Sequence, residues 1–185
     1  EGCEGQKEVK KVSIRTKKNQ ITKIKTSMLC VSGGFNPDIH LFTQSKGLLK
    51  WDKDHLTFKP DRIFQRTITL GSVSGNFSYE KLLVEVEKKL SEFEGLNELE
   101  VKFELNGPEK FQIKELWETK HEKKSLWSKS FIDLQNDVTT KDLRQAVNEG
   151  FNRMEHLKRF TTNSMGTDQG KISSINALGI VSKIL

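Results

Sequence analysis

The sequence is poor in cysteine and has no long hydrophobic run. Only Cys3 and Cys30 occur among the 185 residues, so the chain can build neither a disulfide framework nor a CxxC pair for zinc or an iron–sulfur cluster. No stretch approaches the ~20 apolar residues that a membrane-spanning helix needs, and no apolar signal segment opens the chain. We therefore expect a cytoplasmic protein, with no membrane span and no secretory signal within these residues.

Sequence motifs of catalytic and metal sites are missing as well. No HExxH, GxSxG or GxGxxG pattern occurs, so a zinc protease, a serine hydrolase and a primary dinucleotide-binding loop have no support. The histidines share no ligand spacing, and we interpret them as surface or structural residues: His40, His55, His121 and His156. We expect no metal site and no catalytic residue in this chain.

What the chain does contain is a modest excess of positive charge. Lysine and arginine number 31 against 25 acidic residues, which gives a net charge of +6. The excess is spread along the sequence, so it does not by itself indicate nucleic acid, although a basic nucleic-acid-binding module stays an alternative. The length allows one compact domain or two small ones. Because the chain begins at Glu1 in polar sequence without Met, we expect a piece of a longer protein.

The first part of the chain is expected to form strands. Apolar and polar residues alternate over residues 12–16 and 22–26, with a polar turn between them, which predicts a β-hairpin. The continuous apolar run over residues 28–31 predicts a strand buried on both faces of a parallel sheet. On this interpretation Cys30 is a small buried hydrophobe rather than a nucleophile.

Two predicted strands end at glycine pairs. The run over residues 28–31 stops at Gly33-Gly34, and a second short apolar run over residues 67–70 stops at the segment 71–75, which holds two more glycines. Glycine lets a backbone approach a phosphate, a ribose or a flavin ring. Taken alone, the pairs are better explained as ordinary turns after strands, because neither loop is a complete GxGxxG fingerprint.

A helix and a linker are expected next. An amphipathic helix is predicted over residues 78–93, with Glu85 and Lys89 as a favourable pair on its polar face. Residues 94–130 are expected to be a linker that carries one amphipathic strand over residues 99–105.

From about residue 131 the pattern becomes helical. Thr139 with Asp142 forms a capping-box-like start, and Gly150 can end that helix. A second helix is expected around Met154 and Leu157. A last helix is expected to bury four residues: Ile172, Ile175, Leu178 and Val181.

The polar loop over residues 161–171 is a candidate anion site. Three cations flank it: Lys158, Arg159 and Lys171. Free backbone amides at a helix start, together with these charges, would attract an anion. The alternative is a capped helix start, with Thr167 or Asp168 as the cap and the cations solvated.

Three blocks of sequence resemble the alpha subunit of heterotetrameric sarcosine oxidase. They are VSGGFNPDIHLF (31–42), TLGSVSGNFS (69–78) and the long block FIDLQNDVTTKDLRQAVNEGFNRMEHLKRFTTNSMGTDQGK (131–171). The resemblance implies an α/β fold. Residues 1–93 would be the C-terminal part of an NAD/FAD-type dinucleotide-binding region, a partial two-dinucleotide-binding-domain flavoprotein-like sheet. After the linker 94–130, residues 131–185 would be a small helical module that resembles a [2Fe-2S] domain without its cysteines.

The resemblance also implies an activity and partners. Enzymes of this family oxidise sarcosine to glycine, produce hydrogen peroxide and pass the one-carbon unit to tetrahydrofolate. The alpha subunit holds NAD, shares FMN with the beta subunit, and acts only in a complex with beta, gamma and delta subunits. An alpha subunit of a related amine, opine or proline dehydrogenase complex is the alternative.

The family's motifs mark the residues expected to approach NAD or FMN. In the glycine-containing blocks they are Gly33, Gly34, Asn36, Pro37, Gly71, Ser72 and Gly75. Ser72 stands where many relatives carry an Asp that binds a flavin ribityl group, which favours NAD over FAD. In the helical module they are Lys158, Arg159, Thr161, Thr162 and Lys171, which we expect on the side nearest FMN and the beta subunit.

The same alignment explains why the helical module should hold no cluster. Asp133 and Gln135 replace the first pair of cluster cysteines, and Asp168 with Ser173 or Ser174 replaces the second. Carboxylate, amide and hydroxyl groups cannot supply the thiolates that such clusters use. The module is expected to keep its fold as a docking surface.

Overall fold

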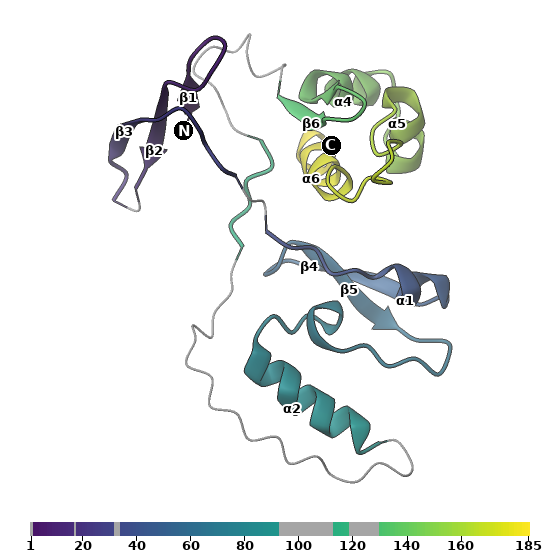
Figure 1. Ribbon diagram of the computed structural model, residues 1–185. Coiled ribbons are helices and arrows are strands. Elements are labelled where there is room, and N and C mark those ends of the chain that lie inside the picture. Colours follow the sequence, from purple (N-terminus) through teal and green to yellow (C-terminus); the bar gives the residue numbers. More distant parts are fainter. Residues whose placement is uncertain (1, 17, 32–33, 93–112, 119–129) are drawn as a thin grey trace. The chain divides into compact units, whose positions relative to one another are not determined.

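The chain folds as two compact units of mixed strands and helices. The computed structural model describes residues 2–16, 18–31, 34–92, 113–118 and 130–185 (Figure 1). One unit comprises residues 1–32 with 116–185, and the other comprises residues 33–115. The described strands pair only antiparallel, in three separate small sheets.

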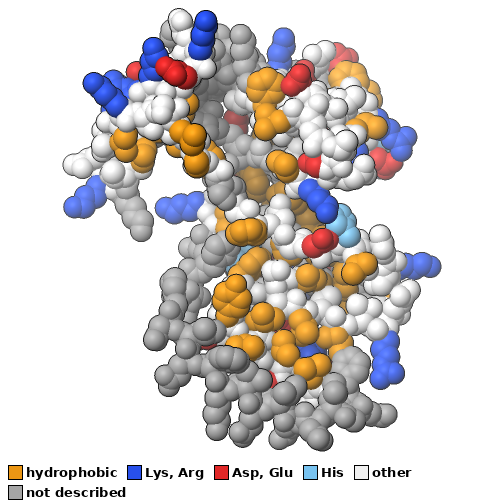
Figure 2. Space-filling model, in the orientation of Figure 1, with side chains coloured by type: hydrophobic (Ala, Val, Ile, Leu, Met, Phe, Trp, Pro, Cys, Tyr) orange, Lys and Arg blue, Asp and Glu red, His pale blue; other side chains and the backbone are white. Residues whose placement is uncertain are grey.

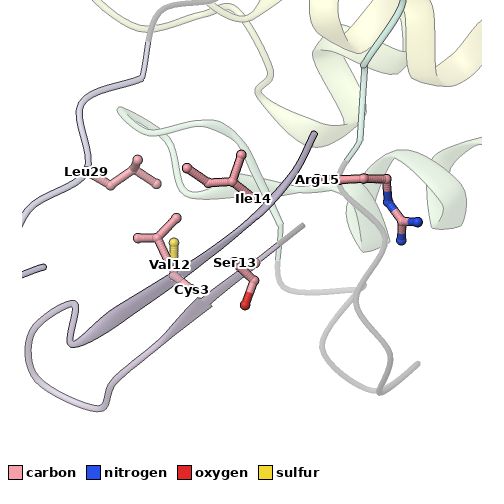
Figure 3. Close-up of a pocket in the computed structure, with 7 residues that line it drawn as sticks. Cys3, Val12, Ser13, Ile14, Arg15 and Leu29 are labelled. Carbon is pink, nitrogen blue, oxygen red and sulfur yellow. The ribbon is translucent and has the colours of Figure 1, made fainter. Parts of the chain in front are cut away.

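The first sheet contains the predicted hairpin. Its three strands, in spatial order, are β1 (Gly2–Glu4), β2 (Lys11–Arg15) and β3 (Ile21–Lys25). Val12 lies opposite both Cys3 and Ile24. Figure 3 shows the side chains of Val12, Ile14 and Leu29 on one side of the sheet, while Ser13 points the other way, as the two-residue period of a strand requires. Together with Cys3 they line a pocket of about 370 Å³.

The apolar run over residues 28–31 does not form the predicted buried strand. These residues are irregular, Met28 and Val31 are 71% and 82% exposed, and Cys30 is exposed rather than buried. A continuously apolar strand is stable only between two neighbouring strands with both faces covered. Since the described part of the first sheet ends at β1 and β3, the run has no such neighbours.

The second unit is built on a hairpin that the sequence analysis missed. Lysine, aspartate and proline interrupt the apolar alternation of its strands, which hides them from a pattern search. The predicted helix is confirmed and begins after Ser78, whereas residues 67–70 are irregular rather than a strand. The elements are α1 (His40–Gln44), β4 (Leu48–Asp52), β5 (Thr57–Arg62), the 3₁₀ turn η1 (Gly71–Ser74) and α2 (Tyr79–Leu90).

The C-terminal part is a small helical module with its own core. Its elements are β6 (Phe131–Asp133), β7 (Val138–Thr139), α4 (Thr140–Asn148), α5 (Met154–Thr161) and α6 (Ser174–Ile184). The buried core residues come from all of these elements: Ile132, Val138, Leu143, Ala146, Leu157, Ala177, Ile180 and Val181.

The ends of the helices follow local chemistry. Asp142 Oδ2 accepts hydrogen bonds from the Thr139 N–H and hydroxyl at 2.8 and 2.7 Å, so the predicted capping box is confirmed. Gly150, with φ of 92°, ends α4 as predicted, because its N–H and that of Phe151 satisfy the carbonyls of the last turn. Ile172 was expected in the core but precedes α6 and is 74% exposed.

Two further observations complete the fold. The predicted strand over residues 99–105 lies outside the described residues. Within the described ranges, every helix is too short or too polar to cross a bilayer.

Trp117 covers the last helix at a glycine. A Cβ atom at Gly179 would overlap the Trp117 ring, which packs against the core of the module. Glu118, the next residue, binds Arg144 on α4 through Oε2 at 2.6 Å. Two adjacent residues, Trp117 and Glu118, therefore attach this segment to the helical module.

We predict that Gly179→Ala destabilises the protein by about 1–3 kcal/mol through overpacking against the indole. In a Trp117→Ala background the same change should stabilise it by up to about 1 kcal/mol, because alanine has the higher helix propensity. Urea unfolding of the four proteins, followed by circular dichroism, measures this reversal. Equal destabilisation in both backgrounds would show that the ring does not exclude the methyl group.

Candidate functional site

A buried carboxylate joins the two loops of the helical module. Asp133, 3% exposed, ends β6, and its Oδ1 accepts the N–H groups of Gln135 and Asn136 at 2.9 and 3.2 Å. Its Oδ2 accepts the N–H of Ser164, 31 residues later, at 2.8 Å. Burial alone would raise the pKa of Asp133, but the hydrogen bonds from Ser164, Gln135 and Asn136 outweigh it and lower that pKa.

Gln135 makes a second bridge between the same loops. Its Oε1 accepts the N–H and the hydroxyl of Thr167 at 2.6 and 2.8 Å, and lies 3.4 Å from the N–H of Asp168. Asn136 adds a third bridge, because its Nδ2 donates to the carbonyl of Thr162 at 3.0 Å. A side chain at Gly166 would overlap Gln135. The close approach of the two loops therefore requires glycine there.

Three serine hydroxyls form the centre of this contact. Ser164 Oγ lies 3.0 Å from Ser173 Oγ, accepts a hydrogen bond from Ser174 Oγ at 2.9 Å, and accepts another from Asn163 Nδ2 at 2.9 Å. Asn163 and Ser173 are each 1% exposed. We call the whole set the interloop network: Asp133, Gln135, Asn163, Ser164, Asp168, Ser173 and Ser174.

The interloop network contains every position that the resemblance aligns with a cluster cysteine. Asp133 and Gln135 reach the loop that carries Asp168, and Ser173 and Ser174 meet at Ser164. These groups are oxygen and amide donors already engaged with one another. They do not fit an iron–sulfur cluster, which needs thiolates.

Most backbone N–H groups of the loop over residues 161–171 already have acceptors within the protein, so few amides remain for an anion, and the anion site stays a prediction. Its N–H groups bind inside the loop or to the interloop network: those of residues 163–165, 167–172 and 174 all have acceptors. Helix α6 begins only at Ser174. Asp168 caps the preceding turn, where it accepts the N–H groups of Gly170 and Ile172 at 3.1 and 3.2 Å. Asp168 thus caps a turn before the helix, and neither Thr167 nor Asp168 caps α6 itself, whose N-cap is Ser173.

What the loop offers to a ligand is side-chain charge. Lys158 and Arg159 lie in the last turn of α5, and Arg159 pairs with Glu155 at 2.9 Å. Within the described residues no carboxylate pairs with Lys158 or Lys171. The hydroxyls of Thr161 and Thr162 donate to the carbonyls of Leu157 and Thr161 at 2.8 and 2.6 Å.

The glycine turn of the second unit is held by a carboxylate of the chain itself. Gly71 and Gly75 have φ of 66° and 93°, which favours glycine. Glu85 Oε2 accepts the Gly71 N–H at 3.0 Å, the Ser74 hydroxyl at 2.9 Å and the Asn76 amide at 2.8 Å.

Glu85 interacts favourably with Lys89, as expected, and it also lies in a partly buried environment. Burial would raise its pKa, but hydrogen bonds from Asn76, Ser74 and Gly71, with the charge of Lys89, lower it. An open pocket of about 440 Å³ lies beside the turn, and Asn76, Glu85 and Lys89 are among the residues that line it.

A second buried carboxylate, unnoticed in the sequence, lies below the turn. Asp52, 6% exposed, accepts Lys59 Nζ at 2.7 Å and contacts His55 Nδ1 at 3.0 Å. Burial opposes ionisation of Asp52, but Lys59, His55 and two backbone amides lower its pKa well below the ordinary value. His55 stacks on Phe77, with ring centroids 4.6 Å apart. These contacts agree with the interpretation of His55 as a structural residue.

The predicted site residues fall into both units. Gly71, Ser72 and Gly75 share the turn, while Gly34, with φ of 95°, Asn36 and Pro37 lie in the irregular segment before α1. Gly33 lies outside the described residues. The charged and threonine residues all belong to the helical module: Lys158, Arg159, Thr161, Thr162 and Lys171.

We predict that Asp133→Asn lowers the free energy of unfolding at neutral pH by about 1–3 kcal/mol, because an amide NH₂ would face a backbone donor. The folded-state pKa of Asp133 is depressed, so the carboxylate contributes stability at pH values above the ordinary pKa of an aspartate, and this stability is lost as the pH falls through the folded-state pKa. The difference in the free energy of unfolding between the wild type and Asp133→Asn should therefore become smaller in acid. Asp137→Asn, exposed on the same loop, is the control for denaturant titrations over pH and should change stability by less than about 0.5 kcal/mol.

We predict that Glu85→Ala destabilises the protein by about 1–3 kcal/mol, because the Gly71 N–H and the Asn76 amide lose their acceptor, while the Ser74 hydroxyl keeps the Gly71 carbonyl. Glu87→Ala, exposed on the same helix, should cost less than about 0.5 kcal/mol. Thermal unfolding compares the two variants, and amide exchange reports whether Gly71 loses protection. Slow exchange of Gly71 in Glu85→Ala would contradict the assigned role of this carboxylate.

Comparisons with known proteins bear on this arrangement. Residues 127–185 match the family model of the sarcosine oxidase A3 domain. Over 169 residues the chain is 28% identical to sarcosine oxidase subunit alpha of Corynebacterium sp. (strain P-1), with 88% of this chain and 18% of the relative covered. Over 167 residues it is 32% identical to the subunit alpha of Rhizobium meliloti (strain 1021), with 86% and 16% covered.

A solved structure shows the fold. The crystal structure of L-proline dehydrogenase from P. horikoshii superposes with a TM-score of 0.56 at 21% identity, and covers 98% of this chain and 38% of that one. The predicted α/β class, part of a flavoprotein-like fold followed by a helical module, is confirmed. The chain spans less than a fifth of the length of its curated relatives. The resemblance inferred from the sequence is thus confirmed: over most of its length the chain is similar to alpha subunits of sarcosine oxidase, and its C-terminal module matches the A3 domain of that family.

Proposed function

We propose that this chain is part of the alpha subunit of a sarcosine oxidase complex. The complex demethylates sarcosine oxidatively to glycine, produces hydrogen peroxide and passes the one-carbon unit to tetrahydrofolate. Beta, gamma and delta subunits complete the enzyme. We place it in the cytoplasm, a reducing compartment in which free thiols such as those of Cys3 and Cys30 are common. The observation that carries the proposal is the interloop network, which lies inside the region matching the A3 domain.

The chain's own role in this complex is positional rather than catalytic. Among the described residues no group of histidine, cysteine and carboxylate side chains could hold a metal ion. The Asp52–His55 pair resembles a base and its orienting carboxylate, but Asp52 also binds Lys59 and His55 is stacked on Phe77. This pair supports the glycine turn, and sarcosine chemistry belongs to a partner subunit.

The glycine turn fits a dinucleotide such as NAD only in part. The Gly71 N–H is already bound to Glu85, so it does not receive a phosphate. The adjoining pocket is lined by Lys81, Lys88 and Lys89 and also by the carboxylates of Glu80 and Glu85, so a diphosphate there would have to be met by the lysines. NAD would therefore be bound at this turn by the lysine side chains, and the glycines, which lack side chains, would let it approach the backbone closely.

FMN at the helical module would likewise be bound by side chains rather than by backbone amides. Most of the loop's amides are engaged internally, whereas within the described residues no carboxylate pairs with Lys158 or Lys171. Two lysines suit a phosphate as point charges. When bound, FMN would supply electron transfer to oxygen, and these residues would hold its phosphate at the boundary with the beta subunit.

A related alpha subunit is the second candidate. The likeness to an L-proline dehydrogenase favours it, because a secondary amine other than sarcosine would use the same kind of subunit. A nucleic-acid-binding module is less well supported. On the face in Figure 2, the described Lys and Arg side chains are dispersed rather than gathered into one patch.

We predict that this chain, co-expressed with the beta, gamma and delta subunits of its own organism, copurifies as a complex whose flavin absorption bleaches with sarcosine and recovers in air. Bleaching by L-proline alone would instead establish the second candidate. Lys158→Ala with Lys171→Ala should lower the FMN content of the complex, whereas Lys50→Ala, in the other unit, should not. A complex that forms without flavin, or no complex, would overturn the proposal.

A further inference from the structure

The glycine turn of the second unit gathers three hydrogen-bond donors around one oxygen atom. The Gly71 N–H and the Asn76 side-chain amide donate to Glu85 Oε2 at 3.0 and 2.8 Å. The Ser74 hydroxyl lies 2.9 Å from the same oxygen. Backbone and side-chain donors that converge in this way form a concave site for an anion. The anion at that point is a carboxylate of the chain itself, which comes from α2.

The turn is closed by hydrogen bonds that do not involve α2. The Asn76 N–H and the Ser74 hydroxyl both donate to the Gly71 carbonyl, at 2.9 and 2.8 Å. The Gly75 N–H donates to the Ser72 carbonyl at 3.1 Å. Because these bonds hold the turn on their own, its donors keep their places when the carboxylate is removed. The turn is therefore preorganised for whichever anion replaces it.

An open pocket adjoins the donors of the turn. This pocket, of about 440 Å³, is lined by Asn76 and Glu85, two members of the contact, and by Lys81, Lys88 and Lys89. Because Glu85 forms part of the pocket wall, a shorter side chain at this position would join the pocket to the donors. The lysines would then place positive charge near them, which suits a phosphate or a carboxylate.

Charge decides which anion occupies the turn. Burial would raise the pKa of Glu85, but the hydrogen bonds of the turn outweigh it and lower that pKa, so this side chain is a carboxylate at neutral pH. A phosphate at the same donors would contact this carboxylate, and two negative charges in contact at a partly buried site repel each other. Glu85 and a phosphate therefore exclude each other from the turn.

We propose that the glycine turn is an oxyanion site that Glu85 keeps closed, so that a small phosphate or carboxylate binds there only when the Glu85 side chain is absent or has moved away. Such a site goes beyond the proposed function and does not depend on the sarcosine oxidase complex. It also separates two modes of binding for a dinucleotide. With Glu85 in place the phosphates meet only the lysines, whereas contact with the Gly71 N–H requires Glu85 to leave.

The test measures the affinity of inorganic phosphate for the full chain and three variants. Glu85→Ala should bind phosphate about ten- to a hundredfold more tightly than the wild type, because donors become free and a like charge is lost. Glu85→Gln keeps an acceptor of the same shape without the charge, so its affinity should lie between the two. The matched control is Glu80→Ala, which removes a carboxylate from the same pocket wall but not from the turn. It should change Kd by less than about threefold.

Nuclear magnetic resonance spectra locate the bound anion. In Glu85→Ala, phosphate should shift the signals of the Gly71 N–H and of the Asn76 side-chain amide. Formate, a carboxylate without a side chain, should shift the same two signals. Both anions should also raise the unfolding temperature of Glu85→Ala by more than that of the wild type, with chloride at matched ionic strength as the reference.

Two results would overturn the proposal. One is phosphate binding to the wild type that shifts the Gly71 N–H as strongly as in Glu85→Ala, because Glu85 would then not close the turn. The other is a folded Glu85→Ala chain that binds phosphate no more tightly than Glu80→Ala. If Glu85→Ala does not fold, Glu85→Gln carries the comparison, and an affinity equal to that of Glu80→Ala rejects the site. Neither result bears on the sarcosine oxidase complex, whose test is its flavin absorption.

Discussion

The helical module depends on one buried carboxylate. Asp133 joins the turn after β6 to the loop between α5 and α6, and its two oxygens accept three backbone N–H groups. A carboxylate out of water is stable only with such partners. The helices supply the apolar core, but the conformation of the loops follows from this contact and from the serine hydroxyls that adjoin it. These hydrogen bonds cross-link the two loops, as a metal cluster at the same positions would.

Carboxylates with several hydrogen-bond donors also stabilise the second unit. Glu85 accepts hydrogen bonds from the glycine turn, and Asp52 binds Lys59 across the adjoining hairpin. In both units the carboxylate takes the place that an external anion could otherwise occupy at exposed amides. A phosphate at either of these two described sites would therefore depend mainly on lysine and arginine side chains, which would make its affinity sensitive to salt.

The elements that were predicted correctly from the sequence are those determined by residues close to one another along the chain. The hairpin before residue 26, helix α2, the Thr139 cap and the Gly150 stop all depend on residues a few positions apart. The buried strand at residues 28–31 failed because its stability depends on neighbouring strands. The sequence revealed only part of the interloop network. Five of its members drew notice because the resemblance aligns them with cluster cysteines. The hydrogen bonds themselves, such as that from the Ser164 N–H to Asp133, join residues about thirty positions apart and leave no local pattern.

One feature of the loop between α5 and α6 has an evolutionary consequence. Its shape is set by Asp133, Gln135 and Ser173, whereas the side chains of Leu134 and Ile172 on the same loops are 74% exposed. Mutations of such exposed side chains can therefore accumulate without unfolding the module. The surface of these loops is free to change during evolution, because the stability of the module depends on the buried network beneath it.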